Sequence, residues 1–206
     1  MTDLHNARIG CCMTGSFCTF EKAFAAFEQL RAAGAELYPI MSYNAYDLDT
    51  RFGTAREMRA RLEKIARRPL WHTLEAVEPI GPKKLLDLLV IAPCTGNTLS
   101  KLAHGVCDTP AAMAAKSHLR NGRNVLIAVS TNDGLGRSAQ NIGVLQAMKQ
   151  FFFVPYGQDD WRNKPQSLVA SMELLPAAAR EALAGRQMQP VLLGARPDSS
   201  GNEKNS

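Results

Sequence analysis

Apolar and polar positions along this chain follow a strand period and a helix period in turn. Apolar runs of strand length cover residues 8–13, 36–41, 85–92, 124–129 and 151–154, and a shorter one covers 70–74. Apolar positions at helical spacing predict helices over 19–33, 54–67, 99–104, 110–119, 138–149 and 167–184. Pro176 lies inside the last of these, where it predicts a kink or an early break.

The alternation of strands with helices indicates one α/β domain. We expect a three-layer αβα fold with a mostly parallel, Rossmann-like sheet, because parallel strands need helical connections. No linker or internal repeat divides the chain, so residues 1–190 are predicted to form a single domain. The periodicity fades after Pro190, and residues 191–206 are predicted to be a disordered tail.

Small polar residues follow four of the predicted strands. The carboxyl ends of parallel strands meet at one edge of a sheet, which is where α/β proteins bind ligands. A polar turn that opens a helix offers free N–H groups, hydroxyls and a positive dipole end, which suit an anion such as phosphate. The same Thr and Asn side chains can instead serve only as helix caps. The candidate ligand contacts are Thr14, Gly15, Ser16, Ser42, Cys94, Thr95, Gly96, Asn97, Thr98, Ser130, Thr131 and Asn132.

Common nucleotide-binding motifs are missing from the sequence. No Gly-x-Gly-x-x-Gly follows the first strand, and no Gly-x-x-x-x-Gly-Lys-Ser/Thr occurs. These absences argue against a dinucleotide-binding Rossmann domain and a P-loop ATPase.

The net charge of +5 comes largely from residues 51–68. Met58, Leu62 and Ile65 recur there at helical spacing, with Glu57 and Glu63 among the basic residues. A solvated helix face therefore explains this stretch better than a nucleic-acid-binding surface.

Cysteine usage indicates a reducing compartment. The chain has five cysteines, no Cys-x-x-Cys pair and no spacing that indicates a metal site. It also lacks a visible signal peptide and a run long enough to span a membrane, so we expect a cytoplasmic protein.

Three other positions leave two interpretations open. Cys94 precedes a helix N-terminus, which favours a reactive thiolate, but a packed and inert thiol is the better interpretation. The Gln158-Asp159-Asp160 loop offers an acid/base or cation-binding pair, or simply a turn. Trp161 in that loop marks a partner contact if it is exposed.

Residues 92–108 resemble the flavoprotein family that includes the phosphopantothenoylcysteine decarboxylases. In that family a Pro-Ala-Ser-Ala-Asn-Thr segment, followed by Lys-x-Ala-x-Gly-x-x-Asp, binds FMN; this chain has Lys101 and Asp108 at the ends of the second pattern. Residues 13–16 resemble the family's first loop, and Ser42 lies where its second strand ends. The resemblance covers residues 8–154 and implies an FMN site and self-association.

The chain departs from the decarboxylases at three places. In the decarboxylases a histidine precedes the buried strand. The corresponding position in this chain is near Pro79, and His72 lies seven residues earlier. Ser130-Thr131-Asn132 replaces a Pro-x-Met-Asn loop, and Thr95-Gly96 replaces Ser-Ala. A prolyl residue cannot act as a base, so decarboxylation is not the expected activity.

Residues 80–84, 94–98, 130–136 and 154–160 resemble one branch of this family, which contributes to a two-component oxidoreductase of sporulating bacteria. That resemblance implies that dihydrodipicolinate, a pyridine dicarboxylate precursor, is oxidised to dipicolinate. It also implies that the other component carries the NADP-binding fold. An FMN-dependent decarboxylase acting alone and a binding protein without chemistry remain as alternatives. No residue is assigned a catalytic role.

Overall fold

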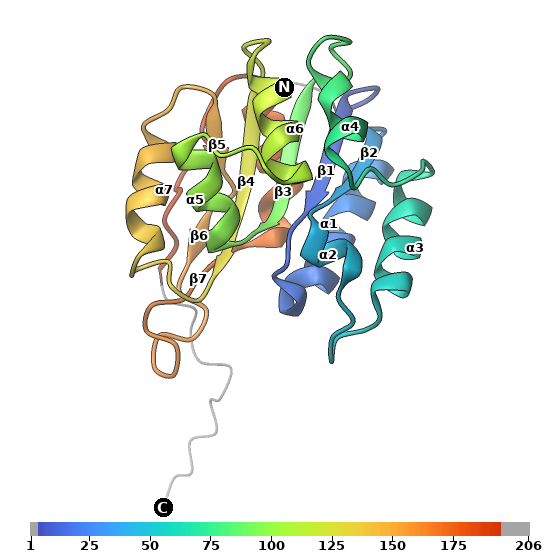
Figure 1. Cartoon of the computed structure of the whole chain (residues 1–206). Helices are drawn as coiled ribbons and strands as arrows, with labels where there is room; N and C mark the ends of the chain where they lie inside the picture. The colour runs from blue at the N-terminus through green and yellow to red at the C-terminus, as the bar shows by residue number, and fades with distance from the viewer. Residues whose placement is uncertain (1–3, 195–206) are drawn as a thin grey trace, which may run out of the picture.

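The computed structural model describes residues 4–194 and centres on a seven-stranded sheet (Figure 1). The strand order is β2-β1-β3-β4-β7-β6, and β5 also pairs with β4. The strands are β1 (Arg8–Met13), β2 (Glu36–Met41), β3 (Leu88–Cys94), β4 (Asn124–Thr131), β5 (Phe151–Phe153), β6 (Tyr156–Gly157) and β7 (Leu168–Ala170). The first five strands pair in parallel, which confirms the predicted α/β fold with a mostly parallel sheet.

The sheet is buried on both faces. All seven residues of β3 are buried, as are the six central residues of β4, which explains their continuous apolar runs. Strand β5 pairs with the first half of β4, and β7 pairs antiparallel with Ser130 and Thr131 at the end of β4. The end of β4 is therefore held beside the β6–β7 hairpin.

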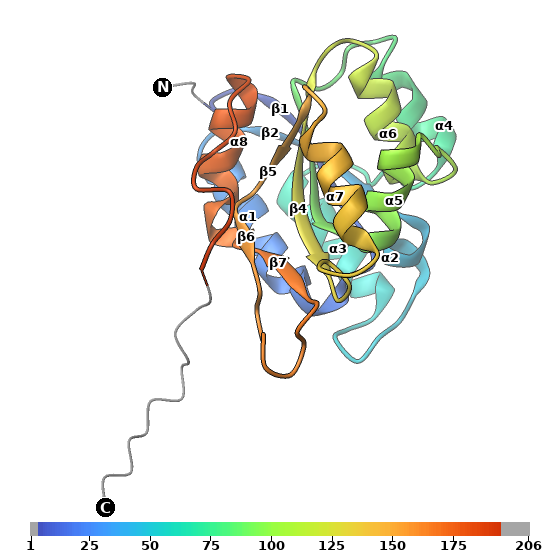
Figure 2. The ribbon, with the colours of Figure 1, turned by 90° about the vertical axis from the view of Figure 1, so that its left-hand side faces the viewer.

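Helices cover the two faces of the sheet in separate layers. Figure 2 shows α1 and α8 on one face, and α5, α6 and α7 on the other. The helices are α1 (Phe20–Ala32), α2 (Tyr43–Asp47), α3 (Ala55–Ala66), α4 (Leu74–Val77), α5 (Gly96–His104), α6 (Pro110–Leu119), α7 (Ser138–Gln146) and α8 (Leu175–Leu183), with 3-10 turns at Phe17–Thr19, Glu78–Ile80 and Met172–Leu174. This arrangement agrees with the predicted three layers.

The basic stretch forms helix α3 and packs as a solvated helix does. Its apolar residues Met58, Leu62 and Ile65 are buried. On its polar side, Arg61 pairs with Glu21 at 2.6 Å, and other arginines lie over aromatic rings of neighbouring elements. Several of these positive charges are thus used inside the fold.

Several predicted elements differ in the structure. The helix predicted from residue 167 begins at Leu175, because residues 168–170 form β7, and Pro176 lies in the first turn of α8, where proline is tolerated. The strand predicted over 70–74 is reduced to a single bridge between Trp71 and Ile40. Helix α5 begins at Gly96 instead of Leu99, and α7 ends at Gln146.

The chain also stays ordered past the predicted start of the tail. Within residues 191–194, the Val191 carbonyl accepts from Tyr156 N at 3.0 Å, and Leu193 N donates to the Tyr156 carbonyl at 2.9 Å. The rest of the predicted tail, 195–206, lies outside the described residues. In the part of the chain that the structure describes, no helix is long and apolar enough to cross a membrane.

Candidate functional site

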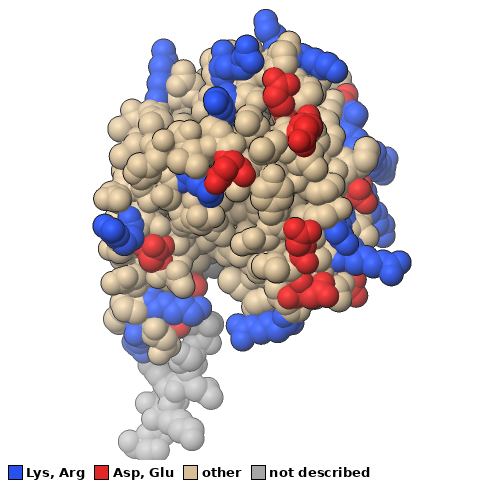
Figure 3. Space-filling view, in the orientation of Figure 1, with Lys and Arg blue, Asp and Glu red and all other residues tan. Residues whose placement is uncertain are grey.

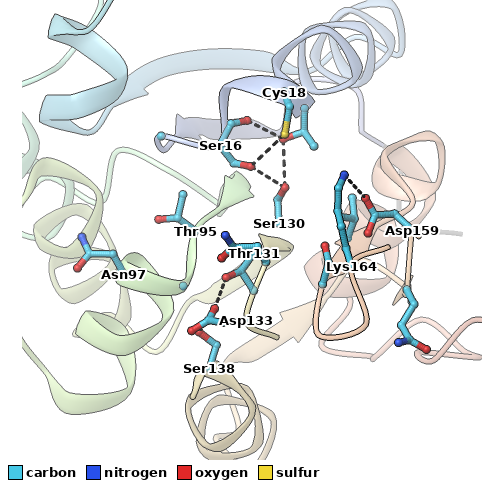
Figure 4. Close-up of a pocket in the computed structure, with 18 of the residues that line it drawn as sticks. Ser16, Cys18, Thr95, Asn97, Ser130, Thr131, Asp133, Ser138, Asp159 and Lys164 are labelled. Carbon is cyan, nitrogen blue, oxygen red and sulfur yellow. Dashed lines mark hydrogen bonds and ion pairs between the residues drawn. The ribbon is translucent and has the colours of Figure 1, made fainter. Parts of the chain in front are cut away.

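A cavity of about 1060 Å³ opens at the carboxyl edge of the sheet. It lies where the loops after β1, β3 and β4 meet the β6–β7 hairpin (Figure 4). Strands β2 and β3 lie on opposite sides of β1, so the chain changes direction there. Such a switch point leaves a crevice between loops, which is the usual ligand site of open α/β sheets.

Hydroxyl groups connect the three loops. The Ser16 hydroxyl lies 2.8 Å from that of Ser130, and the Thr19 hydroxyl lies 3.3 Å from the same oxygen. Thr14 donates to the Pro93 carbonyl at 2.8 Å and accepts from Thr95 N at 3.0 Å. These bonds fix the spacing of the loops, so the cavity wall is formed before any ligand binds.

The structure brings most of the predicted contacts to this cavity. Its lining includes Gly15, Ser16, Thr95, Gly96, Asn97, Ser130, Thr131 and Asn132. Figure 4 shows Ser16, Ser130 and Thr131 close together, whereas Asn97 lies farther out on α5. Three separate strand ends therefore contribute to one site, as the parallel sheet predicts.

Four predicted contacts do not line the cavity. Thr14 and Thr98 are buried and bond to neighbouring loop atoms, and Ser42 caps α2 by accepting from Ala45 N at 3.5 Å. Cys94 is the last residue of β3, and burial raises the pKa of its thiol well above the usual value. Cys94 is therefore a packed thiol, and these residues act as caps or core, the alternative interpretation of polar turns.

An acidic residue that the sequence did not indicate lies in the third loop. Asp133 accepts from the hydroxyls of Thr131 and Ser138, the latter at 2.8 Å. The bond from Thr131, with that from Ser138, holds the pKa of Asp133 below its usual range. The cluster packs against the start of α5: a methyl group on Gly96 would lie 2.7 Å from both hydroxyl oxygens. Only glycine allows this close approach.

Four basic side chains also line the cavity. Three of them are Lys22, Arg51 and Arg137. The fourth is Lys164, whose Nζ lies 3.7 Å from Oδ2 of Asp159 in the loop between β6 and β7. Asp160 instead accepts from Asn163 N at 3.0 Å, which is the turn role that the sequence left open. Trp161 is exposed, the condition for a partner contact.

Helix α7 adds two residues that sequence reasoning missed. Arg137 and Asn141 both line the cavity and are four positions apart, so they share one helix face. The i, i+4 spacing at the start of a helix that follows a polar loop is the signal that would have found them.

No imidazole lines the cavity within residues 4–194. Pro79 lies in the 3-10 turn Glu78–Ile80, and His72 stacks on the Tyr46 ring with centroids 3.7 Å apart. A histidine base of the kind expected in the decarboxylases is therefore not supplied by this part of the chain.

Comparison with known proteins identifies the class of this fold and site. Residues 1–174 match the family model described as Flavoprotein, and the chain belongs to that family. It is 44% identical over 193 residues to the B subunit of dipicolinate synthase from Bacillus subtilis, covering 94% of this chain and 96% of that one. The family resemblance predicted from the loop sequences is thus confirmed.

Solved structures agree with this assignment. The crystal structure of the dipicolinate synthase B subunit from Bacillus halodurans matches with a TM-score of 0.86 and 41% identity, covering 94% of this chain and all of that one. The FMN-dependent cysteine decarboxylase SpaF matches with a TM-score of 0.67 and 20% identity over 88% of this chain and 97% of that one. At that identity the second match supports the fold alone.

Proposed function

We propose that this chain is the B subunit of a dipicolinate synthase and that it works with the A subunit, an NADP-binding partner. Together they would oxidise dihydrodipicolinate to dipicolinate in the mother cell during sporulation. The carrying observation is the 44% identity to the Bacillus subtilis protein over nearly the full length of both chains. In this reaction the dihydropyridine ring loses a hydride and a proton, NADP⁺ accepts the hydride, and the aromatic ring forms.

We further propose that the cavity binds FMN. Its volume of about 1060 Å³ is ample for a ligand of that size, and its hydroxyls and basic side chains suit a phosphate. Ser16 and Ser130 would hold the cofactor from the β1 and β4 loops, with the Thr95 turn on the third side. Bound FMN supplies reversible two-electron redox chemistry. A structural neighbour, Burkholderia xenovorans DmrB, is described in complex with FMN, which supports the proposal at the level of the fold.

Self-association and pairing with the NADP-binding partner are proposed together. The name of the Bacillus subtilis relative implies an enzyme of more than one kind of subunit. A UbiX-like decarboxylase from Escherichia coli, a structural neighbour, is described as dodecameric. Exposed Trp161 and Phe52 near the cavity are available for such contacts.

Reconstitution tests the function. We expect the mixture of this chain with the NADP-binding partner to form dipicolinate and NADPH, measured by ultraviolet absorbance, and either protein alone to form neither. Full activity from the partner alone would contradict a catalytic role for this chain. Release of carbon dioxide from a cysteine-derived acid by this chain alone would favour the decarboxylase alternative.

A double variant separates chemistry from binding. Asn97→Ala with Asn132→Ala removes two amides from the cavity lining. We expect a large loss of turnover while the complex with the NADP-binding partner survives gel filtration, and Gln29→Ala on the exposed surface of α1 serves as the control. Unchanged turnover would favour a binding protein without chemistry.

The visible absorption spectrum with and without added FMN tests whether the chain binds this cofactor. We expect a bound-flavin spectrum that persists through desalting. A colourless protein that ignores FMN would assign the loops to substrate instead, and would leave hydride transfer to the NADP-binding partner.

A further inference from the structure

Charged side chains around the cavity are unevenly matched. The lining contains four basic residues, Lys22, Arg51, Arg137 and Lys164, and two acidic ones, Asp133 and Asp159. The basic residues come from four separate segments that surround the opening. Figure 3 shows Lys and Arg side chains on both sides of the hollow at the lower edge of the molecule.

The two acids are already engaged. Asp159 pairs with Lys164, and Asp133 accepts from two hydroxyls. Lys22 and Arg137 form no ion pair with any carboxylate among residues 4–194. Their charges are therefore left for a ligand.

Both of these basic residues occupy helix positions that favour the opposite charge. Arg137 is the N-cap residue of α7, and Lys22 lies in the first turn of α1. The N-terminus of a helix carries partial positive charge, so a cation there is locally unfavourable. Residues that violate a local rule in this way are expected at functional sites.

Asn141 provides an independent observation on the same helix face. This residue is 6% exposed, lines the cavity, and has an Oδ1 atom without a hydrogen-bond partner. An unpaired buried amide oxygen costs free energy of folding, so buried polar groups are normally satisfied. Rotation of the amide about its last side-chain torsion exchanges the oxygen and the nitrogen, so Nδ2 can take the unpaired position and donate to an anion.

We propose that Arg137 and Asn141 of α7, with Lys22 of α1, form a receptor for an anionic, oxygen-bearing group of the bound ligand. The group is a carboxylate of the pyridine dicarboxylate or the phosphate of FMN, two sources with the same chemistry. The identity of these ligands rests on the proposed function; the receptor itself rests on the cavity, the unpaired charges and the unpaired amide. Asp133 makes the side of the cavity near α5 unfavourable for the same anion.

Two variants test the receptor by isothermal titration of the full chain with dipicolinate, FMN and riboflavin. Arg137→Gln removes the charge, and Asn141→Leu replaces the amide with an apolar group of similar size. We expect each to weaken binding of the anionic ligand at least tenfold. Lys149→Gln, which removes an exposed charge away from the cavity, is the matched control and should bind as the wild-type chain does.

Asn141→Leu also carries a readout that a structural role would not give. We expect its thermal midpoint to equal or exceed that of the wild-type chain, because the unpaired amide is removed from a buried position. Weaker binding together with unchanged or higher stability identifies a ligand-binding residue. A marked fall in stability would identify Asn141 as structural and would overturn its place in the receptor.

Comparison of the three ligands shows whether the receptor binds a carboxylate or a phosphate. Weaker binding of dipicolinate with unchanged FMN assigns the receptor to a carboxylate; weaker binding of FMN with unchanged riboflavin assigns it to the phosphate. Unchanged binding of both anions in both variants overturns the proposal, as does a wild-type chain that binds neither. If the variants lose binding but the mixture with the NADP-binding partner makes no dipicolinate, the proposed function fails while the receptor stands.

Discussion

The amino and carboxyl edges of the sheet differ in how their charged side chains are paired. At the amino edge, Asp87 accepts from Arg8 at 2.7 Å and from Arg123 at 3.0 Å, so each charge has a partner. At the carboxyl edge, Arg137 lacks an ion-pair partner within residues 4–194. A buried polar atom without a hydrogen-bond partner occurs at each edge, His118 Nδ1 at the amino edge and Asn141 Oδ1 at the carboxyl edge, so it is the ion pairing that differs. The same strands connect both edges, so the difference is local: the ion pairs of the amino edge stabilise the fold, and the unpaired charge of the carboxyl edge is the one on which the proposed receptor rests.

The largest expected effect is a loss of folding stability in acid, and it comes from a histidine at the amino edge. His118 is buried there, with Nε2 donating to the Asn124 carbonyl at 2.9 Å, and burial lowers its pKa to about 4. The folded-state pKa lies below the unfolded value, so stability is fully present above pH ~6.5 and is lost as pH falls toward 4. We expect a loss of about 3 kcal/mol across that window from this group. Urea unfolding at pH 7 and at pH ~4 measures it.

A matched pair of variants assigns this loss. His118→Gln keeps a side-chain donor but does not titrate, so its stability should depend less on pH than that of the wild-type chain. His104→Gln, which changes an exposed imidazole, is the matched control. Equal pH dependence in all three proteins would show that carboxylates, and not His118, cause the loss.

Asp87→Asn should cause the next largest loss of folding stability. Burial alone would raise the pKa of Asp87, but the hydrogen bonds from Arg8 lower it on balance. The carboxylate is 33% exposed, so we expect about 2 kcal/mol of destabilisation at pH 7, less than for a fully buried pair. Dipicolinate affinity should not change. A loss of affinity would contradict the separation of roles between the two edges.

The contrast also explains which features the sequence predicts. Strand and helix periods recover the parallel strands and α1, α3 and α6, because each buries one continuous apolar face. The three-residue strand β7 is too short to show a period, and its pairing with the end of β4 and with β6 makes it a strand. Tertiary contacts therefore decide the short elements.

The site follows the same division. Ser16 and Ser130 were predictable, because polar residues that follow parallel strands must share one edge. Asp133 was not, because its approach to the cavity depends on how α7 docks against α5. For Asn141 the only signal in the sequence was its i, i+4 spacing from Arg137. Ser42 caps α2 and does not line the cavity; the sequence could not separate the two roles, because a helix cap and a ligand contact use the same residue types.

Gly96→Ala should disturb the carboxyl edge. The added methyl would lie 2.7 Å from the hydroxyls of Ser138 and Thr131, so we expect about 1–2 kcal/mol of destabilisation from overpacking. Gly143→Ala is the control: no atom lies within 4 Å of its added methyl, and a helical alanine should stabilise the chain by roughly 0.5–1 kcal/mol. Urea midpoints compare the two. Equal stability of both variants would show that α5 and α7 move apart freely.

Asp133→Asn should cause the smallest loss of folding stability, about 1 kcal/mol at pH 7. The loss is small because the amide oxygen of the variant can still accept from the hydroxyls of Thr131 and Ser138. The pKa of Asp133 is lowered in the fold, so its contribution is present above the unfolded pKa and is lost as pH falls through the lowered value. The wild-type chain and this variant should therefore converge in stability once the pH falls below that lowered pKa. The same variant should tighten binding of an anion, because one negative charge leaves the cavity. Weaker anion binding would mean that Asp133 positions the loop for the ligand instead of opposing its charge.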